Sequence, residues 1–310
     1  MSLPQTLHCG PSGWSYPDWN GFVFPKSTHR AGHALTDVAR YFDAVEINTT
    51  FYQPLRPEIA QLWARKVDAN PKFLFTLKLG RRFTHERSLA ASEIARFKEG
   101  VWPLAHAQRL GCVLMQFPWT FRYTEENRSF LIALRRAFHE FSLVAEMRHA
   151  SWMAEEALGT LIDYHIGFAN IDQAAYTKAM PPASILTSPI AYVRLHGRNS
   201  EDWQREFGRT RRPVAAHDYL YTREELQEWK PRIEQIHQHA RLTFVFANND
   251  VGGKSVVNAL QLAEMLGDER RQAPAELIRQ FPVELAEFHS ERPVQGALFH
   301  APIPRRRAVA

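Results

Sequence analysis

The chain has 310 residues, of which 45% are hydrophobic and 23% charged, a balance that excludes a disordered or fibrous protein. It has no run of 18 apolar residues and no secretory signal, so we expect a cytoplasmic protein with no membrane partner. The net charge is +5, but residues 291–310 hold four arginines and one glutamate, which leaves only +2 for the rest. Overall basicity is therefore weak evidence for a nucleic-acid-binding protein.

Eight short apolar runs along the chain alternate with amphipathic segments. The predicted strands cover residues 7–10, 44–48, 73–79, 112–117, 143–148, 166–172, 191–196 and 243–248. The predicted helices cover residues 36–41, 57–67, 92–108, 125–138, 154–165, 223–239 and 253–266. This alternation favours a parallel sheet, and the length suits a single (β/α)8 TIM-like barrel over residues 1–266. Two doubly wound domains are the alternative, but no linker rich in Pro, Gly or Ser divides the chain.

Residues 267–310 are predicted to form a C-terminal extension, helical at first and then a flexible basic tail. Within the tail, Gln295 is followed by Leu298 and Phe299. This spacing resembles the short peptide with which bacterial DNA-processing proteins bind the replication sliding clamp, and it predicts a clamp as partner. The alternative, which is favoured, is that Leu298 and Phe299 pack back onto the barrel.

The chain also resembles a known family through several motifs that occur in one order. They are GPSGWSY at residues 10–16, VEINTTFY at 45–52, QFP at 116–118, EMRH at 146–149, RLHGR at 194–198 and FANN at 246–249. Together they resemble the YecE-like family, the domain of unknown function seventy-two, over about residues 8–266. The resemblance implies a TIM-like barrel and brings no catalytic assignment.

Polar residues gather at the C-terminal ends of the predicted strands, which is the end where TIM barrels carry their sites. Glu46 ends the second strand, Lys78 the third, Glu146 the fifth and Asp172 the sixth. Strand alternation puts Asn48 on the face of Glu46, and Arg148 on the face of Glu146. The carboxylates suit acid–base chemistry or a divalent metal ion, and a network of buried ion pairs is the alternative.

A second group of polar residues follows the last two predicted strands. Arg194, His196 and Arg198 alternate at the end of the seventh strand, and Asn248 and Asn249 end the eighth. Loops after strands 7 and 8 of TIM barrels commonly hold phosphate, and arginine binds it bidentately. We therefore expect these residues to bind an anion, with a helix-capping loop as the alternative.

Aromatic residues populate the predicted loops at the same end. Trp14 and Tyr52 lie nearest the strand ends, which makes them the best aromatic candidates for contact with a ligand. The alternative, which is favoured for most of these aromatics, is that they pack the loops over the barrel.

These features predict that the mouth of the barrel, at the C-terminal ends of its strands, binds an anionic, phosphate-bearing ligand. The favoured reaction is phosphoester hydrolysis with Glu46 and Glu146 as carboxylate catalysts and Lys78 as a group that orients a carboxylate or neutralises charge. The alternatives are a non-catalytic nucleic-acid-binding protein and a sugar isomerase or aldolase in which Lys78 forms a Schiff base. No cofactor is identified, and a divalent metal is not favoured because only His85, His149 and His196 sit suitably.

Overall fold

The computed structural model describes residues 5–21, 23, 34–199 and 217–290. The expected elements in residues 291–310, including Gln295, Leu298 and Phe299, lie outside this range. In the described part, no helix is long and apolar enough to cross a bilayer.

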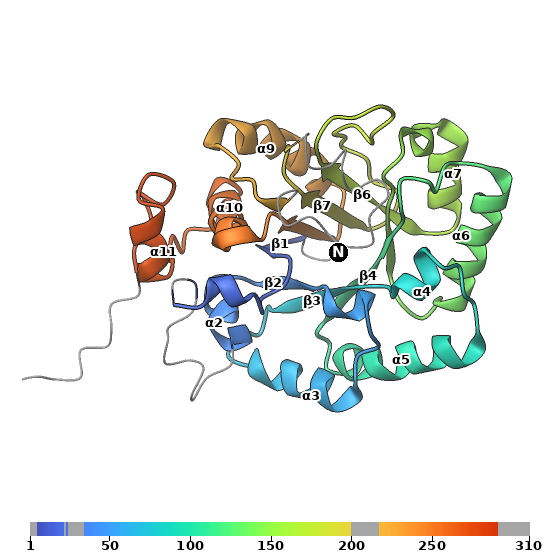
Figure 1. The fold of residues 1–310 in the computed structure, drawn as a ribbon, viewed down its shortest axis with the longest axis horizontal. Coiled ribbons are helices and arrows are strands. Elements are labelled where there is room, and N and C mark those ends of the chain that lie inside the picture. Colours follow the sequence, from blue (N-terminus) through green and yellow to red (C-terminus); the bar gives the residue numbers. More distant parts are fainter. Residues whose placement is uncertain (1–4, 22, 24–33, 200–216, 291–310) are drawn as a thin grey trace, which may run out of the picture.

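Eight parallel strands form one sheet that curves into a barrel (Figure 1). They are β1 (Thr6–Pro11), β2 (Ala44–Ile47), β3 (Leu74–Lys78), β4 (Leu110–Gln116), β5 (Leu143–Glu146), β6 (Ile166–Asp172), β7 (Ile190–Leu195) and β8 (Leu242–Ala247). The sheet order β1-β8-β7-β6-β5-β4-β3-β2 confirms the predicted (β/α)8 TIM-like barrel. Six of the strands are buried along all or almost all of their length, as strands covered on both faces should be.

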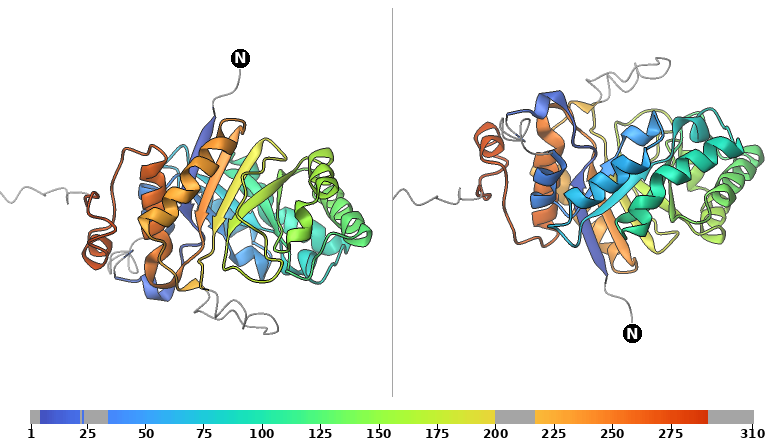
Figure 2. Two further views of the ribbon diagram at one scale, coloured as in Figure 1. Left: turned by 90° about the horizontal axis from the view of Figure 1, so that it is seen from above. Right: turned by 90° about the horizontal axis from the view of Figure 1, so that it is seen from below.

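Helices surround the sheet and connect most of its strands (Figures 1 and 2). They are α2 (Ala34–Tyr41), α3 (Pro57–Lys66), α5 (Ala91–His106), α6 (Glu125–Ala137), α7 (Glu155–Asp163), α9 (Arg223–His237) and α10 (Lys254–Met265). Local signals fix several of their starts. Pro57 occupies the first turn of α3, and Thr222 and Glu225 form a reciprocal capping box at the start of α9.

Two short helices were not predicted individually. The first, α4 (Arg81–Thr84), follows β3 at the mouth, and the second, α11 (Ala275–Gln280), follows α10. Figures 1 and 2 show α11 outside the ring of helices, on the side of α10. Leu277, Leu285 and Phe288 from this extension are nevertheless buried and belong to the main hydrophobic cluster of the barrel.

The strands β1 and β2 close the barrel, but they pair over fewer residues than the other neighbouring strands do. These two strands share a single parallel bridge, Ser12–Glu46, at the mouth, where Gly13 also donates its N–H to the carbonyl of Glu46 at 2.9 Å. A Cβ on Gly10 would lie 2.0 Å from the carbonyl oxygen of Ala44, so only glycine allows the two backbones to approach there. The seam between β1 and β2 thus opens toward the opposite end of the barrel.

Side chains inside the barrel bond across it. The Tyr192 hydroxyl lies 2.8 Å from Oγ1 of Thr76, although β7 and β3 are separated by three strands in the sheet. Both side chains therefore point inward. Because side chains alternate along a strand, Arg194 on β7 and Lys78 on β3 point inward too, one layer closer to the mouth.

Candidate functional site at the barrel mouth

Arg194 is the centre of a buried charge cluster at the C-terminal end of the barrel. Its side chain is fully buried, and its Nη2 lies 2.6 Å from Oε1 of Glu46. Its Nη1 forms an ion pair with Oε2 of Glu146. A buried guanidinium needs such partners, because an unpaired charge in the interior costs several kcal/mol, on the order of 3–5 for a broken pair.

Glu46 is held from three sides. Besides Arg194, it accepts hydrogen bonds from Oγ of Ser12 at 2.5 Å and from the hydroxyl of Tyr192 at 2.7 Å. Burial by itself raises the pKa of Glu46, but the positive charges of Arg194 and Lys78 outweigh it, and the pKa lies below its ordinary value. Glu46 is therefore ionised at neutral pH.

Glu146 bridges two arginines. Its second oxygen, Oε1, lies 2.6 Å from Nη2 of Arg148. Burial again opposes ionisation, but Arg148 and Arg194 lower the pKa of Glu146 well below its ordinary value. Both carboxylates at the mouth thus carry a full negative charge and cannot serve as general acids near pH 7.

His196 lies beside the same cluster, fully buried. Burial and the nearby positive charge of Arg148 keep the pKa of His196 well below its ordinary value, so the ring is neutral. Its Nε2 lies 3.4 Å from Oε1 of Glu146. The imidazole therefore adds no charge to the mouth.

Cations outnumber carboxylates at the ends of β2, β3, β5 and β7. Lys78, Arg148 and Arg194 face Glu46 and Glu146, and all five side chains are buried. Of these three cations, Arg194 has no exposed surface, whereas Lys78 and Arg148 keep 5% and 8% of theirs. These five side chains, taken from the part of the chain that the structure describes, sum to a charge of +1.

The pKa of His85 is affected by this positive charge. It lies just after α4, and its ring packs edge-on against Phe51 at 5.2 Å between centroids. Burial, followed by the charges of Arg81, Lys78 and Arg148, lowers the pKa of His85 to about 4. Positive charge at the mouth also attracts anions.

Asp172 and Arg198 pair with each other away from this cluster. Nη2 of Arg198 lies 2.7 Å from Oδ2 of Asp172, and Trp229 on α9 donates its indole N–H to the same oxygen at 2.5 Å. Register explains the separation. Ile171 is the neighbour of Arg194 in the β6–β7 ladder and faces inward with it, so Asp172 faces outward to the helices.

Of the other predicted site residues, some lie in the charge cluster and others lie outside it. Asn248 lies in the cluster and accepts from Nη2 of Arg194 at 3.1 Å, and Asn48 donates to Oγ of Ser12 at 3.0 Å. Asn249 instead bonds to Asn258 of α10 at 2.7 Å. Trp14 is buried against Trp63, while the ring of Tyr52 is 70% exposed.

Three members of the network were not among the predicted site residues. Ser12 and Tyr192 hold Glu46, and Oε1 of Gln116 lies 3.4 Å from Nη1 of Arg194. Tyr192 stands two residues before Arg194 on the same face of β7, a signal that strand alternation offers. Over the described residues, no group of three or more His, Cys, Asp or Glu side chains is arranged to hold a metal ion.

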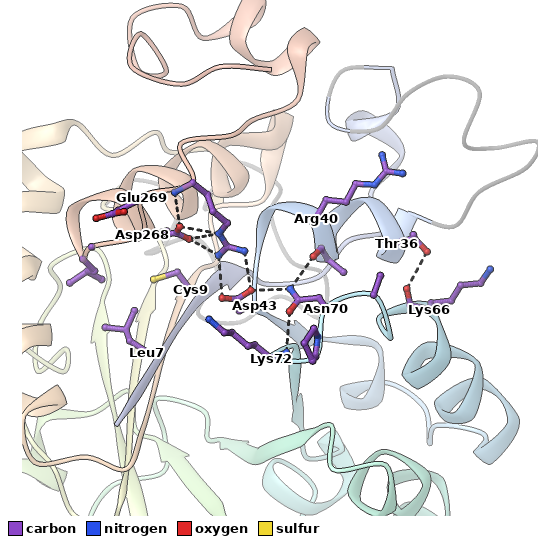
Figure 3. A pocket seen from close by; sticks show the side chains of 17 residues that line it. Leu7, Cys9, Thr36, Arg40, Asp43, Lys66, Asn70, Lys72, Asp268 and Glu269 are labelled. Atoms are coloured by element: carbon purple, nitrogen blue, oxygen red, sulfur yellow. Dashed lines mark hydrogen bonds and ion pairs between the residues drawn. The ribbon is translucent and has the colours of Figure 1, made fainter. Parts of the chain in front are cut away.

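A separate cavity of about 860 Å³ lies at the open part of the β1–β2 seam. Arg270 pairs with both Asp43 and Asp268, and Figure 3 shows these two aspartates with Cys9 and Leu7 of β1 among the residues that line the cavity. The guanidinium lies 3.0 Å from Oδ1 of Asp43 and 2.5 Å from Oδ2 of Asp268. This cavity is distinct from the charged mouth.

Comparison with known families places the chain. A family model described as "Protein of unknown function DUF72" matches residues 8–282, which is most of the sequence. The chain belongs to the DUF72 family. The resemblance drawn from the sequence motifs is therefore confirmed, and the match runs past the last barrel helix into the extension.

Curated relatives and solved structures agree with this assignment. The chain is 25% identical over 277 residues to the UPF0759 protein YunF of Bacillus subtilis, covering 85% of this chain and 95% of YunF. It is 24% identical over 249 residues to YecE of Escherichia coli K12, covering 75% of this chain and 82% of YecE. A DUF72 family crystal structure from Thermotoga maritima matches with 30% identity and a TM-score of 0.72, covering 84% of this chain and 98% of the other. One from Enterococcus faecalis matches with 24% identity and the same TM-score, covering 84% and 95%.

Proposed function

We propose that the mouth of this DUF72 barrel binds a small anionic ligand that carries a phosphate group. The observation that supports the proposal is the charge balance among the described residues of the mouth: three buried cations lie there with two ionised carboxylates and two neutral histidines. An excess positive charge held in a desolvated site is most readily compensated by an anion from solution.

The cations divide into two roles. Arg194 has no exposed surface, and its two terminal nitrogens form ion pairs with Glu46 and Glu146, so it is a positioning residue beneath the site. Lys78 and Arg148 are the cations that reach the surface and contact the ligand. Nη1 of Arg148 donates to Gln173 at 2.8 Å and its Nη2 pairs with Glu146, so Arg148 offers the phosphate its positive charge and its remaining N–H bonds, and Lys78 offers a point charge.

Hydrolysis of a phosphoester is the reaction that we assign to this site. Glu146 is ionised, and its Oε1 forms an ion pair with Arg148 without accepting a hydrogen bond, so we assign this oxygen to accept the proton of a water that attacks the phosphoryl group. As the new P–O bond forms, the P–O bond to the alcohol breaks, and the leaving alkoxide takes a proton from solvent. Arg148 and Lys78 stabilise the charge that develops on the phosphoryl oxygens. Glu46 accepts hydrogen bonds on both oxygens, from Ser12 and Arg194 on Oε1 and from Tyr192 on Oε2, so it acts as a positioning residue rather than a catalyst.

Calorimetric titration with inorganic phosphate at fixed ionic strength tests the binding proposal. We expect saturable binding to the wild type and at least about tenfold weaker binding to Lys78→Gln, because a lost charge-assisted contact is worth about 1.5–3 kcal/mol. Arg65→Gln, which removes an exposed cation on α3, should bind like the wild type. Equal affinities for all three proteins would contradict the proposal, and release of phosphate from a panel of phosphoesters measures turnover separately.

A further inference from the structure

A second cavity of about 310 Å³ adjoins the mouth. The segment after β2, including η2 (Thr49–Phe51), forms one side, and the loop after β3 and the first turns of α5 form the other. Its lining includes four aromatic rings and two arginines: Phe51, Tyr52, Phe83, Phe97, Arg82 and Arg96. The volume is near the lower end for small-molecule sites, which suits one ring system rather than an extended ligand.

One aromatic residue of this cavity is largely exposed to solvent. Tyr52 is 70% exposed, and its ring stands perpendicular to that of Phe51 with centroids 5.2 Å apart. An exposed aromatic face forgoes much of the stabilisation, roughly 1.5–3 kcal/mol, that burial of such a side chain brings. A planar ligand stacked on Tyr52 recovers part of it.

Phe51 connects this cavity to the proposed phosphate site. Nζ of Lys78 lies 6.0 Å from the centroid of the Phe51 ring, and the ring of His85 packs against the same phenyl group. Phe51 also lines the aromatic cavity, so a ligand whose phosphate lies at Lys78 can extend past Phe51 into that cavity.

The two arginines of the cavity differ in their partners. Arg82 forms ion pairs with Glu93 at 2.6 Å and with Glu86 at 3.3 Å. Arg96 makes no ion pair within the described ranges, and its guanidinium offers fork-shaped donors to carbonyl oxygens and ring nitrogens. Glu93, the carboxylate of this lining, is taken by Arg82 and by the Ser88 hydroxyl. Aromatic faces with a guanidinium suit a flat ring that bears acceptors better than a sugar ring that bears hydroxyl donors.

We infer that the ligand is a nucleotide, with its phosphate at Lys78 and Arg148 and its base stacked on Tyr52 with acceptor atoms toward Arg96. This inference rests on the proposed phosphate site for the position of the phosphate. The cavity beside Phe51 provides the separate evidence for the base. Stacking of one base on an aromatic side chain is worth about 1–3 kcal/mol, which corresponds to roughly 5–150-fold in affinity.

Calorimetric titration with uridine monophosphate, ribose 5-phosphate and uridine separates the two parts. In the wild type, the nucleotide should bind at least about tenfold tighter than ribose 5-phosphate. Tyr52→Leu should abolish that preference while leaving the affinity for ribose 5-phosphate unchanged, and Tyr52→Phe should retain it because the ring face remains. Arg96→Gln should weaken nucleotide binding, whereas Arg65→Gln should not.

Two results would overturn the inference: equal affinity of the wild type for nucleotide and ribose 5-phosphate, or an equal loss of both ligands in Tyr52→Leu. Binding of uridine that depends on Tyr52, without any binding of ribose 5-phosphate, would support the base subsite and contradict the phosphate site. The failure of one proposal is thus distinguishable from the failure of the other.

Discussion

Asn248 donates a hydrogen bond from Nδ2 to Nδ1 of His196 at 2.8 Å. The direction of this bond is fixed by Arg194, because a guanidinium has only donors and Oδ1 of Asn248 must accept from it. Nδ1 of His196 is therefore the acceptor, and the ring proton sits on Nε2, which lies 3.4 Å from Oε1 of Glu146. The contact of Nε2 with Nη1 of Arg194, also at 3.4 Å, is then not a hydrogen bond, because both nitrogens are donors. One amide thus sets the tautomer of a buried imidazole at the mouth.

Asn248→Asp is expected to reverse the protonation preference of His196. A carboxylate in this position accepts from both Arg194 and the imidazole, so the charged form of the ring gains a partner and the pKa of His196 rises. At pH values above the raised pKa of His196, where the ring is neutral, the additional negative charge removes the cationic excess, and phosphate should bind at least about tenfold more weakly than to the wild type. Imidazole chemical shifts followed against pH measure the first effect. A ring that stays neutral down to the acid limit of the fold in the variant would refute this account of the bond.

Glu146→Gln is expected to weaken the fold and strengthen binding of anions. The change leaves Arg148 and Arg194 with one ionised carboxylate fewer, which should lower the free energy of unfolding by about 3–5 kcal/mol. Phosphate should restore more thermal stability to the variant than it adds to the wild type, because it replaces the missing charge. Phosphoester turnover should be lost. Thermal melts with and without phosphate give the comparison, and a smaller stabilisation of the variant by phosphate is the contrary result.

Buried histidines should make the fold sensitive to mild acid. Burial lowers the pKa of His8, His149 and His196, and that of His85 falls to about 4. Below an unfolded-state pKa of 6.5, the unfolded chain binds protons that the folded chain does not, so stability is complete above that pH and falls below it. Each histidine contributes a slope of about 1.4 kcal/mol per pH unit between 6.5 and its folded pKa. Urea denaturation at several pH values from 7 to 5 measures this slope, and a flat profile would contradict it.

Asp43→Asn tests the ion pair between Asp43 and Arg270 at the seam between β1 and β2. Both terminal nitrogens of Arg270 lie within 3.2 Å of the Asp43 carboxylate, but the pair is partly exposed. Its loss should therefore cost only about 0.5–1 kcal/mol of stability. Opening of the seam should speed thiol labelling of Cys9, which lines this cavity and whose pKa is raised by burial. Cys112, buried in the barrel, is the internal control. Equal acceleration at both cysteines would indicate general unfolding instead.

The strands and their order could be predicted because each buried strand is a short apolar run between amphipathic segments. The predicted bounds of the sixth strand coincide with those of β6, and those of the second and eighth exceed β2 and β8 by one residue at the C-terminal end. In both cases the extra residue is a polar asparagine, Asn48 or Asn248, which follows the ladder without belonging to it.

Site membership was harder to predict because it depends on which residues of neighbouring strands lie side by side. Asp172 and Arg194 both end apolar runs, yet the ladder aligns Arg194 with Ile171, so only the arginine faces inward. Arg198 has the alternation phase of Arg194 and His196, but Gly197 at φ 95° turns the chain after β7 and ends that alternation. The spacing of residues in the sequence predicts which side chains share a face within one strand. It does not predict the register between strands or where a glycine turns the chain, because both depend on packing in the folded protein.

A crystal soaked in tungstate, which mimics phosphate and is located by its anomalous scattering, tests the central claim most directly. The account predicts a single strong peak at the barrel mouth, within hydrogen-bonding distance of both Lys78 and Arg148. The same soak of Lys78→Gln crystals should lose most of that peak. A wild-type mouth without a peak, or tungstate found only at surface arginines or at the Arg270 seam, would contradict the claim that this mouth binds a phosphate-bearing ligand.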